Sequence, residues 1–323
     1  MKRRQFIQIM SGALGGSLLH PNQSWANTDY PNKPINLVAS FAGMTDGMGH
    51  VLAEAIETQT KHHVVVSVKP GASGIVATEF VRKSKPDGYT LLHTTNTTHA
   101  ANQSLFKSLP YDFVNDFVPV SGVVEGALIF VVNSSSSFKS IDQVTDSARQ
   151  NPGKLSFGWG ASTVLAAVEL YSQMVGINLL RVSYKTNAQA TIDLVGGRLD
   201  LMALDILSAA PYIASGRLRA LAVTGTERMQ SFPNVPTMRE AGLPNYSMTF
   251  WQGIYAPRGT PMSVVQRAAA LIQDAIKSSR ASEFISTANV QPFPLDSEQL
   301  MVFQQEEAKK WHSIVTAAGI QPE

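Results

Sequence analysis

The sequence predicts an α/β protein built from two lobes. Short β-prone runs alternate with helical patterns along almost the whole chain, as in a parallel sheet covered by helices. Two nearly uncharged, β-prone runs, residues 118–132 and 250–256, are typical of strands that cross between lobes. The last third of the chain is mostly helical. Together these observations indicate a hinged protein whose chain leaves its first lobe and later returns to it.

The first lobe is predicted to begin with three strands separated by two helices. We expect strands at residues 35–40, 64–68 and 90–95, and helices at 46–59 and 74–83. The second lobe continues the alternation, with strands at 128–132, 155–157, 180–184, 201–204 and 218–224. Its helices are expected at 141–150, 163–175 and 188–195, and a fourth helix follows the strand at 201–204 and ends at 215. The longest C-terminal helices are expected at 262–277 and 297–318. We therefore predict lobe 1 at 27–128 and 253–323, and lobe 2 at 129–252.

Residues 1–26 are predicted to be a signal peptide that is cleaved near Ala26. Lys2, Arg3 and Arg4 precede a short apolar run, residues 7–19, and small residues follow where a signal peptidase reads. The apolar run is too short to span a bilayer, which takes about 20 residues. The paired arginines also resemble the twin-arginine export signal, and an ordinary secretory signal is the alternative. Both routes predict a periplasmic protein.

Charge and cysteine content exclude several classes of function. The 323-residue chain has a formal charge of +2, of which the signal contributes three positive charges, so the remainder is near −1. This balance does not favour nucleic acid as a partner. The chain has no cysteine, which excludes disulfides, zinc-thiolate sites, a cysteine nucleophile and a lipid-modified cysteine after the signal.

No motif of a known catalytic class is evident. The sequence has no G-x-S-x-G elbow, no Walker A motif and no H-E-x-x-H, and its seven histidines are not at ligand spacing. We therefore expect no enzyme, no catalytic residue, no metal and no cofactor. The alternative from another class is an exported α/β hydrolase, which the missing elbow disfavours.

Small-residue loops follow five of the predicted strands. They are residues 41–49, 94–98, 158–163 and 184–187, and the position of Asp205. Ligands of α/β sheets bind beyond the carboxyl ends of the strands, so these loops should line a cleft between the lobes. From these loops we expect ligand contacts by Gly43, Asn96, Trp159, Thr163, Thr186 and Asp205. Backbone N–H groups and hydroxyls dominate such a cleft, which favours capture of a small carboxylate over catalysis.

Several ordered segments resemble one known family, the Bug proteins, which are extracytoplasmic solute receptors of tripartite tricarboxylate transporters. The matching segments include YPNKPINLV (30–38), KPDGYTLL (85–92), NPGKLSFGWGAS (151–162), FPNVPTMREAGLP (232–244) and WQGIYAPRGTP (251–261). They cover nearly the whole chain after the signal. Each segment is weak alone, and their common order makes chance similarity improbable.

The resemblance implies a Venus-flytrap fold of the type II periplasmic binding class, with two hinge strands, that closes over an organic anion. It also implies docking of the loaded receptor on the membrane permease subunits of a tripartite transporter, and we expect a monomer. The ligand contacts that it implies are Phe41, Ala42, Thr45, Asp46, Ala161, Ser162, Tyr184 and Lys185. A sensor that presents its ligand-bound form to a signalling partner is an alternative with the same architecture.

The chain departs from the family pattern in its loops. The first loop, 40–46, is two residues shorter than usual and lacks a proline and a glycine pair, and the 158–165 loop lacks a histidine. Asp46 is expected either to cap the helix that follows or to meet a donor group on the ligand. Trp159 either stacks on a ligand ring or packs in its own lobe, and Lys185 pairs with a ligand carboxylate or faces solvent. These departures leave the ligand open.

Overall fold

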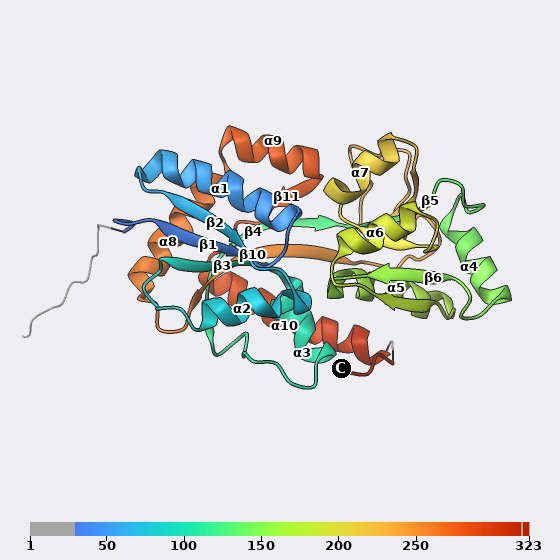
Figure 1. The fold of residues 1–323 in the computed structure, drawn as a ribbon, viewed down its shortest axis with the longest axis horizontal. Coiled ribbons are helices and arrows are strands. Elements are labelled where there is room, and N and C mark those ends of the chain that lie inside the picture. Colours follow the sequence, from blue (N-terminus) through green and yellow to red (C-terminus); the bar gives the residue numbers. More distant parts are fainter. Residues whose placement is uncertain (1–29, 318, 323) are drawn as a thin grey trace, which may run out of the picture.

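The computed structural model describes residues 30–317 and 319–322, so the predicted signal peptide lies outside the described residues. Strands and helices gather in two groups placed end to end, joined by long strands that run between them (Figure 1). This arrangement confirms the predicted two-lobed α/β fold. Within the described residues, no helix is both long and apolar enough to cross a membrane.

The first lobe contains a six-stranded sheet in the order β11-β4-β10-β3-β1-β2. Strand β1 is parallel to β2 and β3, whereas β10 is antiparallel to β3 and β4, so the sheet is mixed rather than purely parallel. The strands are β1 (Ile35–Ala39), β2 (Val64–Val68), β3 (Thr90–Thr95), β4 (Phe117–Ala127), β10 (Thr249–Pro257) and β11 (Val290–Pro292). All of the strands expected in this lobe are present, and β11 was not predicted.

Helices cover both faces of this sheet. Helices α1 and α9 lie on one side in Figure 1, and α2, α3 and α10 lie on the other. Their bounds are α1 (Met44–Thr60), α2 (Ile75–Arg82), α3 (Asn102–Leu105), α8 (Met262–Ile276), α9 (Ser279–Ala288) and α10 (Ser297–Ala317), with short helical turns η1 (Ala72–Gly74) and η2 (Thr97–Ala101). Helix α9 and the helical segment 97–105 were not predicted. The buried positions of α9 do recur at helical spacing, at Ala281, Ile285 and Ala288, whereas the Thr-rich segment 97–105 has low helix propensity.

The second lobe contains two small sheets. Strand β5 (Ile129–Asn133) lies between β8 (Met202–Leu204) and β9 (Leu218–Val223), antiparallel to both. Strands β6 (Ser156–Trp159) and β7 (Leu180–Ser183) form a parallel pair. Helices surround these sheets, namely α4 (Ile141–Gln150), α5 (Ser162–Val175), α6 (Asn187–Val195) and α7 (Ile206–Ala214).

The two predicted crossings are strands in the structure. Strands β4 and β10 pair along their length, and β4 continues into β5 with only Leu128 between them. Trp251 on β10 is buried, and its indole N–H donates to Glu307 of α10 at 3.3 Å, which ties this strand to the returning C-terminal helix. The lobe boundaries 27–128, 129–252 and 253–323 stay a prediction, since they are a division of the chain rather than an observed contact.

Candidate functional site

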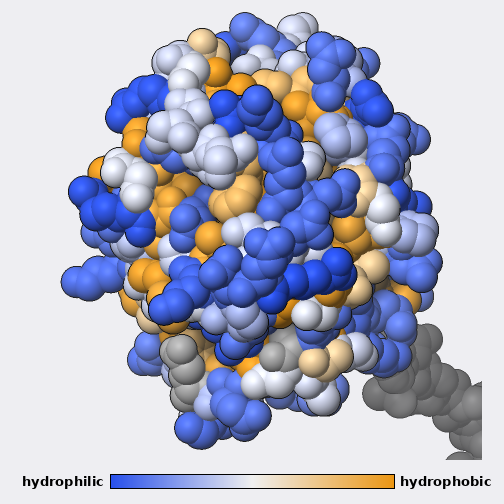
Figure 2. All heavy atoms as spheres, turned by 90° about the vertical axis from the view of Figure 1, so that its right-hand side faces the viewer, coloured by the Kyte–Doolittle hydropathy of each residue, from blue (hydrophilic) through white to orange (hydrophobic). Residues whose placement is uncertain are grey.

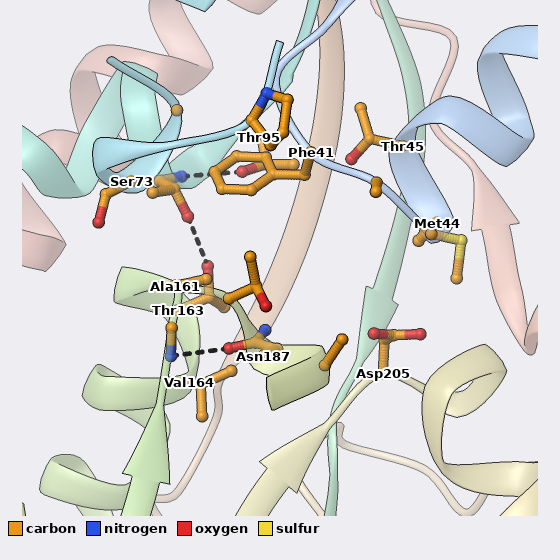
Figure 3. Close-up of a pocket in the computed structure, with 18 of the residues that line it drawn as sticks. Phe41, Met44, Thr45, Ser73, Thr95, Ala161, Thr163, Val164, Asn187 and Asp205 are labelled. Carbon is orange, nitrogen blue, oxygen red and sulfur yellow. Dashed lines mark hydrogen bonds between the residues drawn. The ribbon is translucent and has the colours of Figure 1, made fainter. Parts of the chain in front are cut away.

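A cavity of about 310 Å³ lies between the two lobes, where the loops after several strands meet (Figure 3). On the side of the first lobe it is lined by Phe41, Ala42, Gly43, Met44 and Thr45 after β1, by Pro70, Gly71, Ser73 and Gly74 after β2, and by Thr95 and Thr97 at the end of β3. The second lobe contributes Gly160, Ala161, Thr163, Val164, Lys185, Thr186, Asn187, Ala188, Asp205 and Ser208. The remaining wall consists of Leu128, Phe250 and Gln252 on the crossing segments.

Backbone strain shapes the first-lobe wall. Ala72 and Ser73 have positive φ angles of 45° and 50°, between two glycines that also have positive φ. Such residues persist only where the surroundings hold them, and they are concentrated at binding sites. A Cβ on Gly74 would lie 2.6 Å from a Thr98 methyl and 3.0 Å from the Phe41 ring. Glycine is therefore required for this loop to support Phe41 against the cavity.

Two helices begin at the cavity without a side-chain cap. The N-cap residues are Gly43 for α1, in the first lobe, and Ala161 for α5, in the second, and neither accepts a bond from its helix through a side chain. The first N–H groups of a helix have no partner within the helix, and the helix dipole makes that end favourable for anions. Each lobe thus presents an N-terminus at which a carboxylate can accept hydrogen bonds.

Close packing fixes the second-lobe wall. A Cβ on Gly160 would lie 2.3 Å from the carbonyl carbon of Thr186 and 2.5 Å from the backbone N of Asn187. The Gly160 N–H donates to Asn187 Oδ1 at 2.9 Å, so the loops that precede α5 and α6 are held together. Thr186 caps α6 by accepting from the N–H of Gln189. These loops therefore form one rigid wall.

Lys185 and Asp205 bring opposite charges to the second-lobe wall. Lys185 is exposed and lines the cavity. Asp205 caps α7: its Oδ1 accepts from the Ser208 N–H at 3.0 Å and its Oδ2 from the Ser208 hydroxyl at 2.8 Å. Burial raises the pKa of the Asp205 carboxyl, and the bonds from Ser208 act in the opposite direction.

Hydrogen bonds join the lobes beside the cavity. The Thr163 hydroxyl donates to Asn96 Oδ1 at 3.1 Å and lies 3.1 Å from the Thr97 hydroxyl. The Ser162 hydroxyl donates to Asn102 Oδ1, also at 3.1 Å. All five side chains are buried. The start of α5 is thus connected to the helical segment that follows β3 in the first lobe.

Nine of the fourteen residues predicted to contact ligand line the cavity. They are Phe41, Ala42, Gly43, Thr45, Ala161, Thr163, Lys185, Thr186 and Asp205. The other five lie outside its lining: Asp46, Asn96, Trp159, Ser162 and Tyr184. Whether any of them contacts a ligand stays a prediction.

The five residues outside the lining have other surroundings. Asn96 and Ser162 make the bonds between lobes described above, and Tyr184 donates to Asp193 Oδ2 at 2.7 Å in its own lobe. Asp46 lies in the first turn of α1, whose N-cap is Gly43, so the alternative in which Asp46 is the N-cap was wrong. The shortened loop starts the helix earlier than residue 46.

Trp159 lies beside a second, small cavity of about 30 Å³ instead of the main one. Leu105 and Ile320 line the same small cavity from the first-lobe segments. The indole is half-buried and packs against the hydrophobic core. The side chain thus packs at the junction of the lobes rather than only within its own lobe, and whether it also contacts a ligand stays a prediction.

Sequence reasoning missed Gln252, Phe250 and the 70–74 loop, whereas Met44 and Asn187 lie in loops that were expected to line the cleft. Gln252 is 1% exposed, lies on β10 and lines the cavity. Its Oε1 makes no hydrogen bond of good geometry with a described residue, although its side chain interacts with the neighbouring His93 ring. A buried amide oxygen without a partner is costly, so it marks a place where a ligand can donate a bond. The only sequence signal was a polar residue inside an otherwise apolar strand. Among the described residues, no three His, Asp or Glu side chains gather to hold a metal.

The family model "Tripartite tricarboxylate transporter family receptor" matches residues 48–320. The chain is also 32% identical to Protein BugT of Bordetella pertussis, over 90% of each chain. The chain belongs to this receptor family. The resemblance to Bug proteins inferred from the ordered segments is thereby confirmed.

Solved structures of similar proteins confirm the fold class. The structure of R. palustris Rpa4515 with adipate superposes with a TM-score of 0.87 at 28% identity, covering 91% of this chain and 100% of that one. The periplasmic binding protein BugD superposes with a TM-score of 0.85 at 27% identity, over 91% and 100% of the two chains. The family and these neighbours are solute-binding proteins, so this receptor is not an enzyme, as predicted, and the hydrolase alternative is rejected.

Proposed function

We propose that this receptor captures a small organic carboxylate between its lobes in the periplasm and delivers it to the permease of a tripartite transporter. The observation that carries the proposal is the pair of helix N-termini at Gly43 and Ala161, one from each lobe, which open into the same cavity without side-chain caps. Rpa4515, a structural neighbour, is described with adipate, a dicarboxylate. The two helix N-termini and the name of the family thus both indicate a carboxylate ligand.

The energetics are sufficient for useful affinity. A helix N-terminus contributes about 0.3–1 kcal/mol to the binding of a nearby anion, and each hydrogen bond to a charged group contributes about 1.5–3 kcal/mol. Four such bonds, after the free-energy cost of association, support a dissociation constant in the micromolar range. Closure of the lobes places both N-termini on one ligand, which couples binding to a shape that a permease can recognise.

A substitution at one N-cap tests the proposal. Ala161→Asp places a carboxylate of the protein itself where the ligand carboxylate is expected, and Asp is a strongly preferred N-cap. We expect the free energy of unfolding to stay the same or rise by about 0.5–2 kcal/mol, while binding weakens by at least about tenfold. The measurements are thermal unfolding and calorimetric titration with the acids released from the denatured wild-type protein and identified by mass spectrometry.

Ser140→Asp is the matched control, because Ser140 caps α4 at a distance from the cavity. It should leave binding unchanged. Equal binding by wild type and Ala161→Asp would contradict the role of the α5 N-terminus. The family to which the chain belongs favours transport over sensing. An uptake assay in a strain that lacks the receptor distinguishes the two functions. Unimpaired uptake of the released acid in that strain would favour the sensor.

A further inference from the structure

The charges of the cavity cancel. Lys185 and Asp205 are the only charged side chains among the described residues that line it. Neither takes part in an ion pair with the other or with any other described residue. The rest of the lining is backbone, hydroxyl, amide and apolar surface, including Phe41 and Phe250. A ligand of high negative charge therefore finds only one cation in this cavity, and that cation is opposed by an acid.

The Asp205 carboxylate is held in the cavity wall by donors at the start of α7. Ser208 donates one hydrogen bond to each oxygen of the carboxylate, and the backbone N–H groups of Asp205 and Leu207 also interact with it. The two bonds from Ser208 also hold the side chain in one orientation at the start of α7. Figure 3 shows the carboxylate across open space from Met44, on the side of the second lobe. Asp205 is thus a positioned acceptor in the wall.

Gln252 supplies a second acceptor to the same cavity. Its Oε1 is buried and makes no hydrogen bond of good geometry with a described residue, although the side chain lies beside the His93 ring. It comes from β10 rather than from the second-lobe loops. Free N–H groups at the starts of α1 and α5 supply the donors. The cavity therefore has donors that suit one carboxylate and, separately, acceptors that require a hydrogen-bond donor on the ligand.

We infer that the ligand carries one carboxylate together with a hydrogen-bond donor, such as an ammonium or amide group, which Asp205 and Gln252 accept. The inference rests on the proposed function and narrows its substrate class. A dicarboxylate would bring two negative charges to a cavity whose own charges cancel, and one of them would meet Asp205. An ω-amino acid or another zwitterion instead matches the opposite charges of the wall.

Three acids of equal chain length test this selectivity: adipate, 6-aminohexanoate and hexanoate, titrated calorimetrically into the protein at pH 7. Wild type should bind 6-aminohexanoate at least about tenfold more tightly than adipate. The ammonium group of the first ligand is attracted by Asp205, whereas the second carboxylate of adipate is repelled by it. Asp205→Asn should reverse this order, because it removes the acid and so weakens binding of the amine and strengthens binding of adipate. Asn is as good an N-cap as Asp, so α7 stays capped and the protein folds.

Asp200→Asn is the matched control. Asp200 also lies in the second lobe and accepts from the Ser156 N–H and hydroxyl, at 2.8 and 2.9 Å, but it does not line the cavity. Its substitution should leave the ratio of the two affinities unchanged. Two results overturn the inference: tighter binding of adipate than of 6-aminohexanoate by wild type, or a ratio of these two affinities that is the same in Asp205→Asn. Neither result contradicts the proposed function as a carboxylate receptor.

Failure of the proposed function has a different signature. In that case none of the three acids binds wild type, and denaturation of the purified protein releases no carboxylic acid. If wild type binds none of the three but releases a dicarboxylate that lacks a donor group, the proposed function holds and the inference on ligand charge is wrong.

Discussion

The amide of Gln252 offers a test in which stability and binding change in opposite directions. The side chain is 1% exposed, its Oε1 makes no hydrogen bond of good geometry with a described residue, and it lines the cavity between the lobes. It lies beside His93, and the interaction with the Gln252 amide opposes the fall that burial causes in the pKa of that imidazole. The perturbation is Gln252→Leu, which keeps similar volume and removes the amide.

The expected magnitudes follow from the burial. A buried acceptor without a partner costs about 1–3 kcal/mol, so its replacement by an apolar group of similar shape should be neutral or stabilising by about 1 kcal/mol. For a chain of this length that corresponds to a rise in Tm of about 2 °C. The lost hydrogen bond to the ligand is worth about 1 kcal/mol, so binding should weaken about fivefold.

The assay combines thermal unfolding of the ligand-free protein with calorimetric titration of 6-aminohexanoate and adipate. Gln304→Leu is a closely matched control, because Gln304 on α10 is also 1% exposed with an unpartnered Oε1, but lies outside the cavity lining. Gln304→Leu should raise Tm by a similar amount without any change in affinity. A fall in Tm for Gln252→Leu with unchanged affinity would refute the reasoning, because it would mean that the amide serves the fold.

Two further predictions concern the junction of the lobes and the buried histidines. Thr163→Val removes the bond to Asn96, so it should weaken binding about fivefold through a less stable closed form, measured by titration with 6-aminohexanoate and adipate. Burial lowers the pKa of His93 to about 4 and that of His99 to about 3, so the unfolded chain binds more protons below pH 6.5. The free energy of unfolding should therefore decrease as the pH is lowered from 6.5 to 4, by up to about 1.4 kcal/mol per pH unit for each histidine. Urea unfolding measures this change.

Each of these predictions has its own contrary result. The control for Thr163→Val is Thr191→Val, which removes a threonine hydroxyl that bonds within α6. Equal ligand affinities of the two variants would contradict the claim that the Thr163–Asn96 bond stabilises the closed form. His99→Phe should retain the aromatic contact with Tyr255 and make the dependence of stability on pH less steep. An unchanged slope in that variant would show that other groups cause the loss of stability in acid.

Most of the fold could be predicted because its strands and helices carry strong local signals. The apolar run that forms β1 and the amphipathic run that forms α4 end within a residue or so of their predicted bounds. Ser140 before α4 is a typical N-cap and accepts from Gln143 as expected of one. The antiparallel course of β10 beside β3 was not predictable, because it depends on a contact between segments far apart in the sequence.

The site could be predicted at the level of loops and only partly at the level of side chains. Loops after parallel strands meet at one edge of a sheet, which is a property of the topology and places Phe41 and Lys185 at the cavity. Which way a side chain points within such a loop depends on packing. Trp159 lies beside the small cavity at the junction, and the one sequence signal for Gln252, a polar residue in an apolar strand, did not indicate which way its side chain would point.

Asp205 shows how ligand selectivity can change in this receptor without loss of the fold. Its structural task, capping α7 through the bond from the Ser208 N–H, needs only an oxygen acceptor, which Asn or Ser also supplies. Its electrostatic effect on the cavity needs the charge. Since the two requirements are separable at one position, substitution there changes the preferred ligand charge at little cost in stability. By contrast, Gly160 cannot change without moving the backbone of Thr186, so the loop that presents Lys185 is fixed by packing, whereas the charge at Asp205 is free to vary.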